Sequence, residues 1–302
     1  MCRRKKQFIK YLRKFYKRVQ NSESSILQEV ISEEYIDRLE EEIEKYYSDK
    51  SGNEGFNSPL IAGFLSLFMM DEGNTQEKEP SNRFIHAMGS IEPVLHDSKK
   101  KNLKAKLLEL IQIDFKSTKK DNRELIYEKF TPVFYELIVV GEFAKQYSLL
   151  DIDVQLSEEG SNVDAEFKII ERDILFEITI VLRKLDSRRP LAPDEAGRRI
   201  ENKIYEKTKY GKQLSLSERP SILVIGFTGF VHWNQTNPLQ YATKSLKENR
   251  NCKRLNKISA IIVSQSELFN KGYIYIWFND EASYPLTKEE QDLLKQRFTD
   301  VT

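Results

Sequence analysis

Two acidic residues on consecutive predicted strands, Asp164 and Glu177, are the side chains of this sequence best suited to chemistry. They lie in the segment SNVDAEFKIIERDILFEITIVL, residues 161–182, which predicts two strands joined by a tight polar turn. The second strand is apolar on both faces, which is typical of a strand covered on both sides. A carboxylate buried there is costly unless it is paired, neutralised or bound to a cation. We therefore expect Glu177 to be sheltered from water and kept for a function.

A divalent cation is the partner that would suit two such carboxylates. Asp164 and Glu177 on adjacent strands can place two carboxylates on one ion, and Mg²⁺ takes a few carboxylate oxygens while keeping several waters. Glu136, on a helix predicted over 125–147, could fix a metal-bound water or a second ion. Phosphodiester cleavage needs a hard cation of this kind to neutralise developing charge. The pattern predicts Mg²⁺ (or Mn²⁺) as cofactor.

The order of elements around these residues resembles the PD-(D/E)XK phosphodiesterase superfamily, over roughly residues 125–285. In that family an Asp opens one strand, the next strand carries Glu-x-Lys, and a Glu often lies on the preceding helix. The matching motifs here are Val163-Asp164-Ala165 and Phe176-Glu177-Ile178-Thr179. The resemblance implies an α/β fold with a restriction-endonuclease-like α/β/α core and a mixed central sheet. It also implies a Mg²⁺-dependent nuclease that hydrolyses phosphodiester bonds in nucleic acid, with DNA as the favoured substrate.

One position departs from the family pattern: Thr179 stands where the family places its lysine. Threonine can hydrogen-bond a water but supplies no positive charge. In some relatives the lysine lies on the following helix, predicted here over 193–213, where Lys203 and Lys207 are four residues apart and share one face. Either lysine could reach the site. The alternative is that catalysis has been lost and the scaffold serves as a nucleic-acid or protein binding module.

Each candidate also has a plainer interpretation. Asp164 could be an ordinary strand-end acid, and Glu177 could form a cross-strand pair with Lys168. Glu136 could be a solvated helix residue, and Lys203 and Lys207 could belong to a wet helix face.

Composition sets limits on the class of protein. The 302 residues are 39% hydrophobic with a net charge of +1, so a sizeable core is expected and any nucleic-acid site must be a local patch. Two cysteines exclude a disulfide framework or a cysteine-built zinc site and favour the reducing cytoplasm. The longest apolar run, 60–70, is shorter than the roughly 20 residues needed to span a bilayer, so no integral membrane segment is expected.

The chain is predicted to divide into a helical region, 1–122, and a nuclease-like domain, 123–302. Residues 1–20 form a basic amphipathic helix with no acid before Glu23. Its charges could contact phosphates or an anionic membrane, or its apolar stripe of Phe8, Leu12, Phe15 and Val19 could simply dock it. This region could bind nucleic acid, a partner protein or a second copy of the chain.

The remaining predicted elements alternate between helices and strands. Helices are predicted over 24–47, 60–70, 99–115, 238–249 and 287–298, and 71–82 is predicted to be a polar loop. Thr287 and Glu290 form a capping box at the start of the last helix. Strands are predicted over 151–156, 221–228, 258–264 and 273–279. Strands alternating with helices predict a sheet with helices on both faces.

Overall fold

The computed structural model describes residues 2–48, 80–111, 122–156, 162–182, 191–210, 212–227, 237–248, 252–264 and 274–299. Contacts divide the chain into two compact units, Met1–Gly141 and Glu142–Thr302. The division falls inside helix α7 (Asn122–Ala144), further along the chain than the boundary predicted near residue 122.

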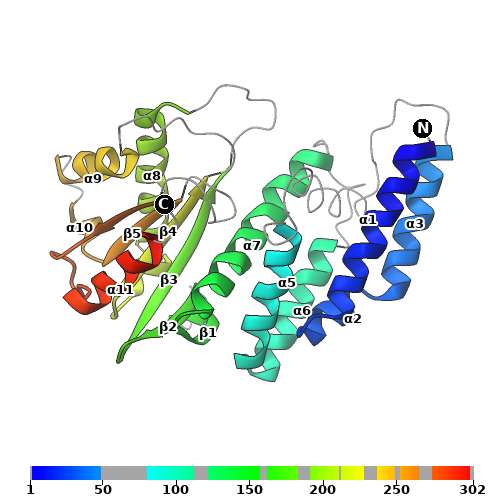
Figure 1. Cartoon of the computed structure of the whole chain (residues 1–302). Coiled ribbons are helices and arrows are strands. Elements are labelled where there is room, and N and C mark those ends of the chain that lie inside the picture. The colour runs from blue at the N-terminus through cyan, green and yellow to red at the C-terminus, as the bar shows by residue number, and fades with distance from the viewer. Residues whose placement is uncertain are drawn as a thin grey trace. The chain divides into compact units, whose positions relative to one another are not determined.

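The described elements of the first unit are all helical (Figure 1). The elements are α1 (Cys2–Gln20), α2 (Ser25–Val30), α3 (Glu33–Ser48), α5 (Pro80–Ile91), the 3₁₀ turn η2 (Glu92–Val94), α6 (Asp97–Ile111) and most of α7. The single helix predicted over 24–47 is wrong, because Ser32 interrupts it and its Oγ accepts a hydrogen bond from the Tyr35 backbone N–H at 3.3 Å. The helix predicted over 60–70 lies outside the described residues. Of the loop predicted over 71–82, the last three residues belong to α5, which begins at Pro80.

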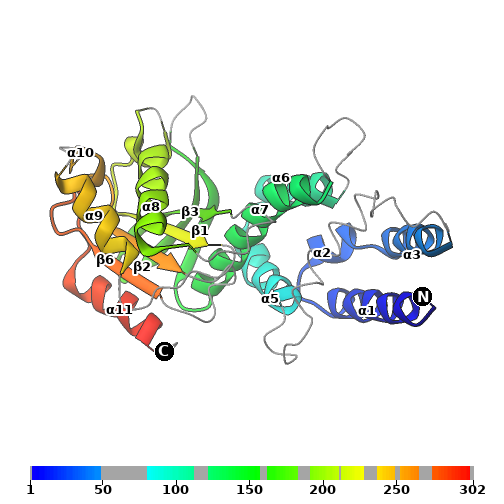
Figure 2. The ribbon, with the colours of Figure 1, turned by 90° about the horizontal axis from the view of Figure 1, so that it is seen from above.

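Helix α1 is docked by its apolar stripe. Leu12, Phe15 and Val19 are at most 1% exposed, and α1 lies beside α3 in both overall views (Figures 1 and 2). On the flank of α1, Arg13 donates to Glu40 at 2.5 and 2.9 Å and to Asp37 at 2.9 Å. The interpretation of a helix held by its apolar side is therefore confirmed for these residues.

A buried carboxylate joins η2 to the start of α2. Glu92, 6% exposed, accepts hydrogen bonds from the Ser24 hydroxyl (2.5 Å), the Ser25 hydroxyl and the Ile26 backbone N–H (3.1 Å). Burial alone would raise the pKa of Glu92, but the Ser24 and Ser25 hydroxyls and the backbone N–H groups outweigh it and hold the pKa below its ordinary value of 4.5. The carboxylate therefore stabilises this corner in its charged form.

Replacing Glu92 by glutamine should lower the free energy of unfolding of the first unit by about 2 kcal/mol at pH 7, because charge-assisted hydrogen bonds are lost. The folded pKa is depressed, so this contribution is present above pH 4.5 and is lost as the pH falls through the lower folded value. Urea denaturation at pH 7 and at pH 3 should show that the free energies of unfolding of the wild type and the variant differ less at pH 3 than at pH 7. The control is Glu29→Gln, whose carboxylate is exposed and pairs with Lys104 on the surface; an equal effect of both changes would contradict the assignment.

Helices α5 and α7 approach each other at Gly141. A Cβ built on Gly141 would lie 2.3 Å from Ala87 Cβ and 2.4 Å from Ala87 Cα. The contact therefore depends on the absence of a side chain at Gly141.

The second unit is built on one mixed sheet with the strand order β1-β2-β3-β4-β5-β6, so the predicted α/β class is confirmed. The strands are β1 (Ser148–Gln155), β2 (Asn162–Ile169), β3 (Arg172–Val181), β4 (Ser221–Phe227), β5 (Ala260–Ser264) and β6 (Ile274–Phe278). The first three form an antiparallel meander, β4 and β5 run parallel to β3, and β6 is antiparallel to β5. The described helical elements are α8 (Pro193–Thr208), η4 (Gln213–Leu216), α9 (Pro238–Glu248), α10 (Cys252–Leu255) and α11 (Lys288–Thr299).

Both faces of the sheet are covered, as the apolar strand β3 predicted. On one face, Leu175 and Leu223 share a core cluster with Ile200 and Ile204 of α8. On the other face, Phe143 at the end of α7 packs against Phe167, Phe176 and Phe298, with ring centroids 6.0, 4.8 and 6.2 Å away. Figure 2 shows α8 and α9 on one side of the sheet and α11 on the other.

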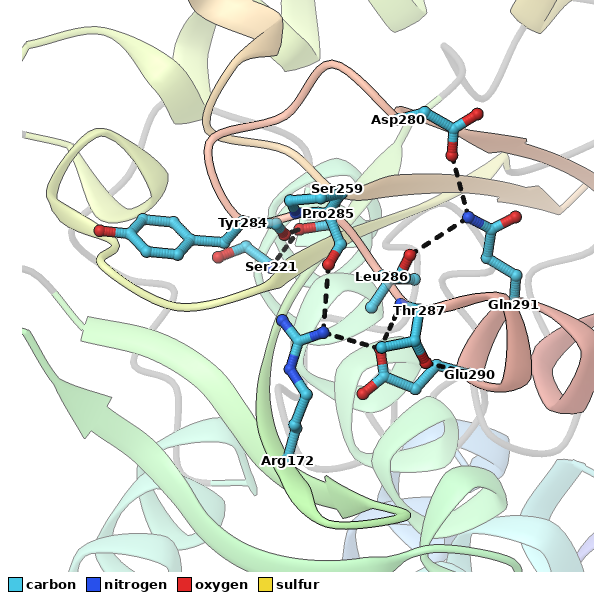
Figure 3. Close-up of polar contacts among 10 residues, drawn as sticks. All are labelled: Arg172, Ser221, Ser259, Asp280, Tyr284, Pro285, Leu286, Thr287, Glu290 and Gln291. Carbon is cyan, nitrogen blue, oxygen red and sulfur yellow. Dashed lines mark hydrogen bonds and ion pairs between the residues drawn. The ribbon is translucent and has the colours of Figure 1, made fainter.

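The predicted capping box at α11 is confirmed and extended by an arginine (Figure 3). Thr287 N–H donates to Glu290 Oε2 at 2.7 Å, and Glu290 N–H donates to Thr287 Oγ1 at 3.2 Å. Arg172, at the start of β3, donates to Glu290 Oε2 and to the Pro285 carbonyl, both at 3.2 Å. This network ties the β2–β3 hairpin to the last helix.

The hairpin turn contains a strained residue. Ile170 follows the pair Ile169↔Arg172, has φ of 58° and is 43% exposed. The left-handed region costs an L-residue roughly 1–2 kcal/mol, and a β-branched side chain is among the least tolerant.

Ile170→Asn should therefore raise the free energy of unfolding of the second unit by about 1 kcal/mol, because asparagine accepts this conformation in a two-residue turn. Ile170→Val, which stays β-branched, should give no gain. Urea midpoints for the three proteins decide the point, and equal midpoints for the Asn and Val variants would contradict the strain.

Candidate functional site

The two predicted carboxylates lie where two strands of the sheet separate. The antiparallel ladder between β2 and β3 extends as far as the pair Ala165↔Phe176. Beyond that pair β2 continues beside β1, and β3 continues beside β4. Asp164 and Glu177 are the next residues on the two strands, and they occupy facing positions at the point of separation. Facing residues of an antiparallel pair project on the same side of a sheet.

Asp164 is held against the backbone of β3. Its Oδ2 accepts a hydrogen bond from the Ile178 N–H at 2.6 Å. The Asp164 side chain thus accepts a hydrogen bond from a backbone N–H of β3 just beyond Ala165↔Phe176, the last pair of the β2–β3 ladder. This contact fixes the Asp164 carboxylate beside the residue that follows Glu177.

Glu177 is fully buried, which confirms the predicted shelter from water. Its Oε1 accepts a hydrogen bond from Lys207 Nζ at 2.5 Å. The alternative of a cross-strand pair with Lys168 is not what is found, because Lys168 faces Asp173 in the register of β2 and β3. The positive charge beside Glu177 is therefore that of Lys207, which belongs to helix α8.

Of the two candidate lysines, α8 brings Lys207 to the sheet. Ile200 and Ile204 of α8 are buried and mark the face of the helix that is turned to the sheet. Lys207, three residues after Ile204, lies at the edge of that face. Lys203 instead forms a surface ion pair with Glu206, at 2.9 Å on the same helix. The sequence did not distinguish Lys203 from Lys207, whereas in the structure Lys207 contacts Glu177 and Lys203 pairs with Glu206.

The remaining candidates differ in their surroundings. Thr179, two residues after Glu177 on β3, is half-buried and faces Ile225 of β4. Glu136 belongs to the first unit, where its Oε1 accepts a hydrogen bond from Lys106 at 3.2 Å. The described contact of Glu136 is thus with α6.

A second buried carboxylate lies on this face, at a residue to which the sequence assigned no role. Glu166 lies two residues from Asp164, is 9% exposed and pairs with Arg219. Burial raises the pKa of Glu166, whereas the charge of Arg219 lowers it without cancelling the rise. The alternation along β2 predicts that Glu166 shares a face with Asp164, but its partner comes from the distant segment before β4.

The backbone of β1 is unusual beside the site. Asp153 lies between Ile152, which faces Ala165, and Val154, which faces Val163, so it is level with Asp164 on the neighbouring strand. Its φ is 48°, a left-handed value that aspartate tolerates better than most residues. Three adjacent strands thus carry an acidic residue at this level of the sheet.

The number of carboxylates at this point of the sheet limits the kind of metal that it could hold. Within the described ranges, no group of three or more His, Cys, Asp or Glu side chains is arranged to hold a metal ion. Mg²⁺ usually takes one or two carboxylates and keeps several waters, whereas structural zinc takes four protein ligands. Asp164 and Glu177 supply two carboxylates, a number within what Mg²⁺ takes from a protein and below the four ligands of structural zinc.

Comparisons with models of protein families, with curated proteins and with solved structures give no match to this chain. Among the helices that the structure describes, none has the length and apolar character needed to cross a membrane.

Proposed function

We propose that this chain is a metal-dependent nuclease that hydrolyses phosphodiester bonds in nucleic acid, with DNA as the first substrate to test. The observation that carries the proposal is the meeting of Asp164, Glu177 and Lys207 where β2 and β3 separate. The element order α7-β1-β2-β3-α8-β4 and the mixed sheet are also those implied by the PD-(D/E)XK resemblance.

In this proposal Asp164 and Glu177 hold Mg²⁺ (or Mn²⁺), which when bound neutralises charge that develops on the scissile phosphate. The Ile178 N–H orients Asp164, and burial keeps Glu177 in one position. Lys207 replaces the lysine that the family carries two residues after its glutamate. Its ammonium, beside Glu177, can donate to an attacking water or to a phosphate oxygen. We assign no role to Glu136 or Lys203.

The test compares cleavage of single- and double-stranded DNA and RNA by the wild type, Asp164→Asn and Glu177→Gln, each with Mg²⁺ and with EDTA. We expect cleavage by the wild type in Mg²⁺ alone and its loss in both variants. Circular dichroism should show that the variants remain folded. Equal cleavage by all three proteins would assign the activity to another source and overturn the proposal.

A second candidate is a binding module that retains the sheet without catalysis. It is favoured by Thr179 at the family's lysine position and by the ion pair through which Lys207 already neutralises Glu177. Titration calorimetry with Mg²⁺ and Mn²⁺ separates the two candidates. No heat of binding at millimolar metal, together with no cleavage and retained affinity for nucleic acid, would establish the module.

A further inference from the structure

We propose that a row of exposed lysines on α1 binds the phosphate backbone of nucleic acid. The lysine row consists of Lys6, Lys10, Lys14 and Lys17, all exposed. The inference rests on the proposed function, because it identifies a surface that would hold the substrate of that activity. The lysine row belongs to the first unit, and the proposed catalytic carboxylates belong to the second.

The spacing of the lysine row places it on one face of the helix. Steps of four, four and three residues at 100° per residue keep the four side chains within an arc of about 80°. At 1.5 Å per residue the row is roughly 16 Å long, which matches on the order of five phosphates along one strand. Leu12, Phe15 and Val19 lie on the opposite, buried side.

The charges of the lysine row are available to a ligand. Within the part of the chain that the structure describes, none of the four lysines forms an ion pair. Arg13, on the flank of the same helix, is instead held by Glu40 and Asp37 of α3. The acidic residues of α3 thus neutralise the flank of α1 and leave its outer face positive.

Nucleic acid fits this face better than a membrane does. A helix that binds at a membrane surface inserts an apolar face beside its basic one, but the described apolar stripe of α1 is already buried in the unit. Protein interfaces are usually anchored by buried aromatic or apolar side chains, whereas this row consists of lysines alone. A regular series of positive charges is what sequence-independent phosphate binding requires.

The test measures binding of labelled DNA to the full chain in EDTA, so that no cleavage is needed for the readout. The row variant changes Lys6, Lys10, Lys14 and Lys17 to Gln, and the control variant changes the exposed Lys244, Lys247, Lys288 and Lys295 of the second unit to Gln. We expect the row variant to lose about 100-fold in affinity at 0.1 M salt and to show a shallower salt dependence, because each lost phosphate contact removes about 0.9 from the slope. The control variant, with the same change in charge, should stay within about twofold of the wild type.

An arginine version of the row, which keeps the charge, should bind as the wild type does. Unchanged affinity and slope in the glutamine row variant would overturn the proposal, as would equal losses in the row and control variants. Binding of the wild type to phosphatidylserine vesicles but not to DNA would also overturn it. Loss of DNA binding in the row variant of a chain that never cleaves would support the row and reject the nuclease, so the two failures are distinguishable.

Discussion

Replacing Lys207 by methionine should lower the free energy of unfolding of the second unit by about 3 kcal/mol. Glu177 is fully buried, and the change removes the ammonium that contacts its Oε1. Breaking a buried ion pair by removing one partner is strongly destabilising, because the other charge stays in a medium that solvates it poorly. If the nuclease proposal holds, the same variant should lose most of its Mg²⁺-dependent cleavage, by about 100-fold or more.

The chain supplies a matched control in Lys203, four residues earlier on α8. Its ion pair with Glu206 is on the surface, so Lys203→Met should change stability by no more than about 0.5 kcal/mol. Changing Glu177 and Lys207 together to apolar residues should recover much of the loss, which a double-mutant cycle would measure. Equal stability of the Lys203 and Lys207 variants would show that Glu177 does not depend on Lys207.

The Lys207→Met variant also reports on the cation. A metal that binds the folded site stabilises the protein in proportion to the logarithm of its concentration above its dissociation constant. If Mg²⁺ binds at Asp164 and Glu177, raising its concentration should increase the melting temperature of this variant more than that of the wild type, because Lys207 no longer competes for Glu177. Equal shifts in both proteins would place the Mg²⁺ effect elsewhere.

Gly141→Ala should destabilise the first unit by about 2 kcal/mol, although alanine is the better helix former. The added Cβ would lie within 2.4 Å of backbone and side-chain atoms of Ala87, so α5 and α7 must move apart. Such overpacking costs roughly 1–3 kcal/mol. Hydrogen exchange of peptides from α5 and α7, together with urea denaturation, would measure the effect.

Gly89 provides the control, because a Cβ built at this position of α5 would lie 3.5 Å from its nearest neighbour, Glu23 Cβ. Gly89→Ala should therefore raise stability by roughly 0.5–1 kcal/mol through helix propensity alone. Ala87→Gly in the Gly141→Ala background should recover part of the loss. A stabilising effect of Gly141→Ala would contradict the close approach of the helices.

The hairpin and its carboxylates were predictable because their signals are local. Alternation along β2 and β3 places Asp164 and Glu177 on one face, and apolar residues on both sides of Glu177 predict its burial. The capping box of Thr287 and Glu290 is likewise a short-range pattern.

Other features depended on distant parts of the chain. Lys203 and Lys207 share one helical face, and only the rotation of α8 over the sheet decides which of them meets Glu177. The pairing of Glu166 with Arg219 joins segments far apart in the sequence. Helical periodicity continues through Ser32, so the break between α2 and α3 was hidden from an argument based on apolar spacing.

The position of α7 determines how the chain can be cut into fragments. Gly141 meets Ala87 in one hydrophobic core, whereas Phe143, two residues later, contacts Phe176 in the other. A fragment that begins at β1 would lack Phe143 and expose the aromatic side chains beneath it. A fragment that begins near residue 122 would carry Phe134 and Gly141 of α7 without Phe84 and Ala87, their partners from α5. Expression of the sheet-bearing half alone should therefore start within the last two turns of this helix, with polar replacements for the apolar residues left uncovered.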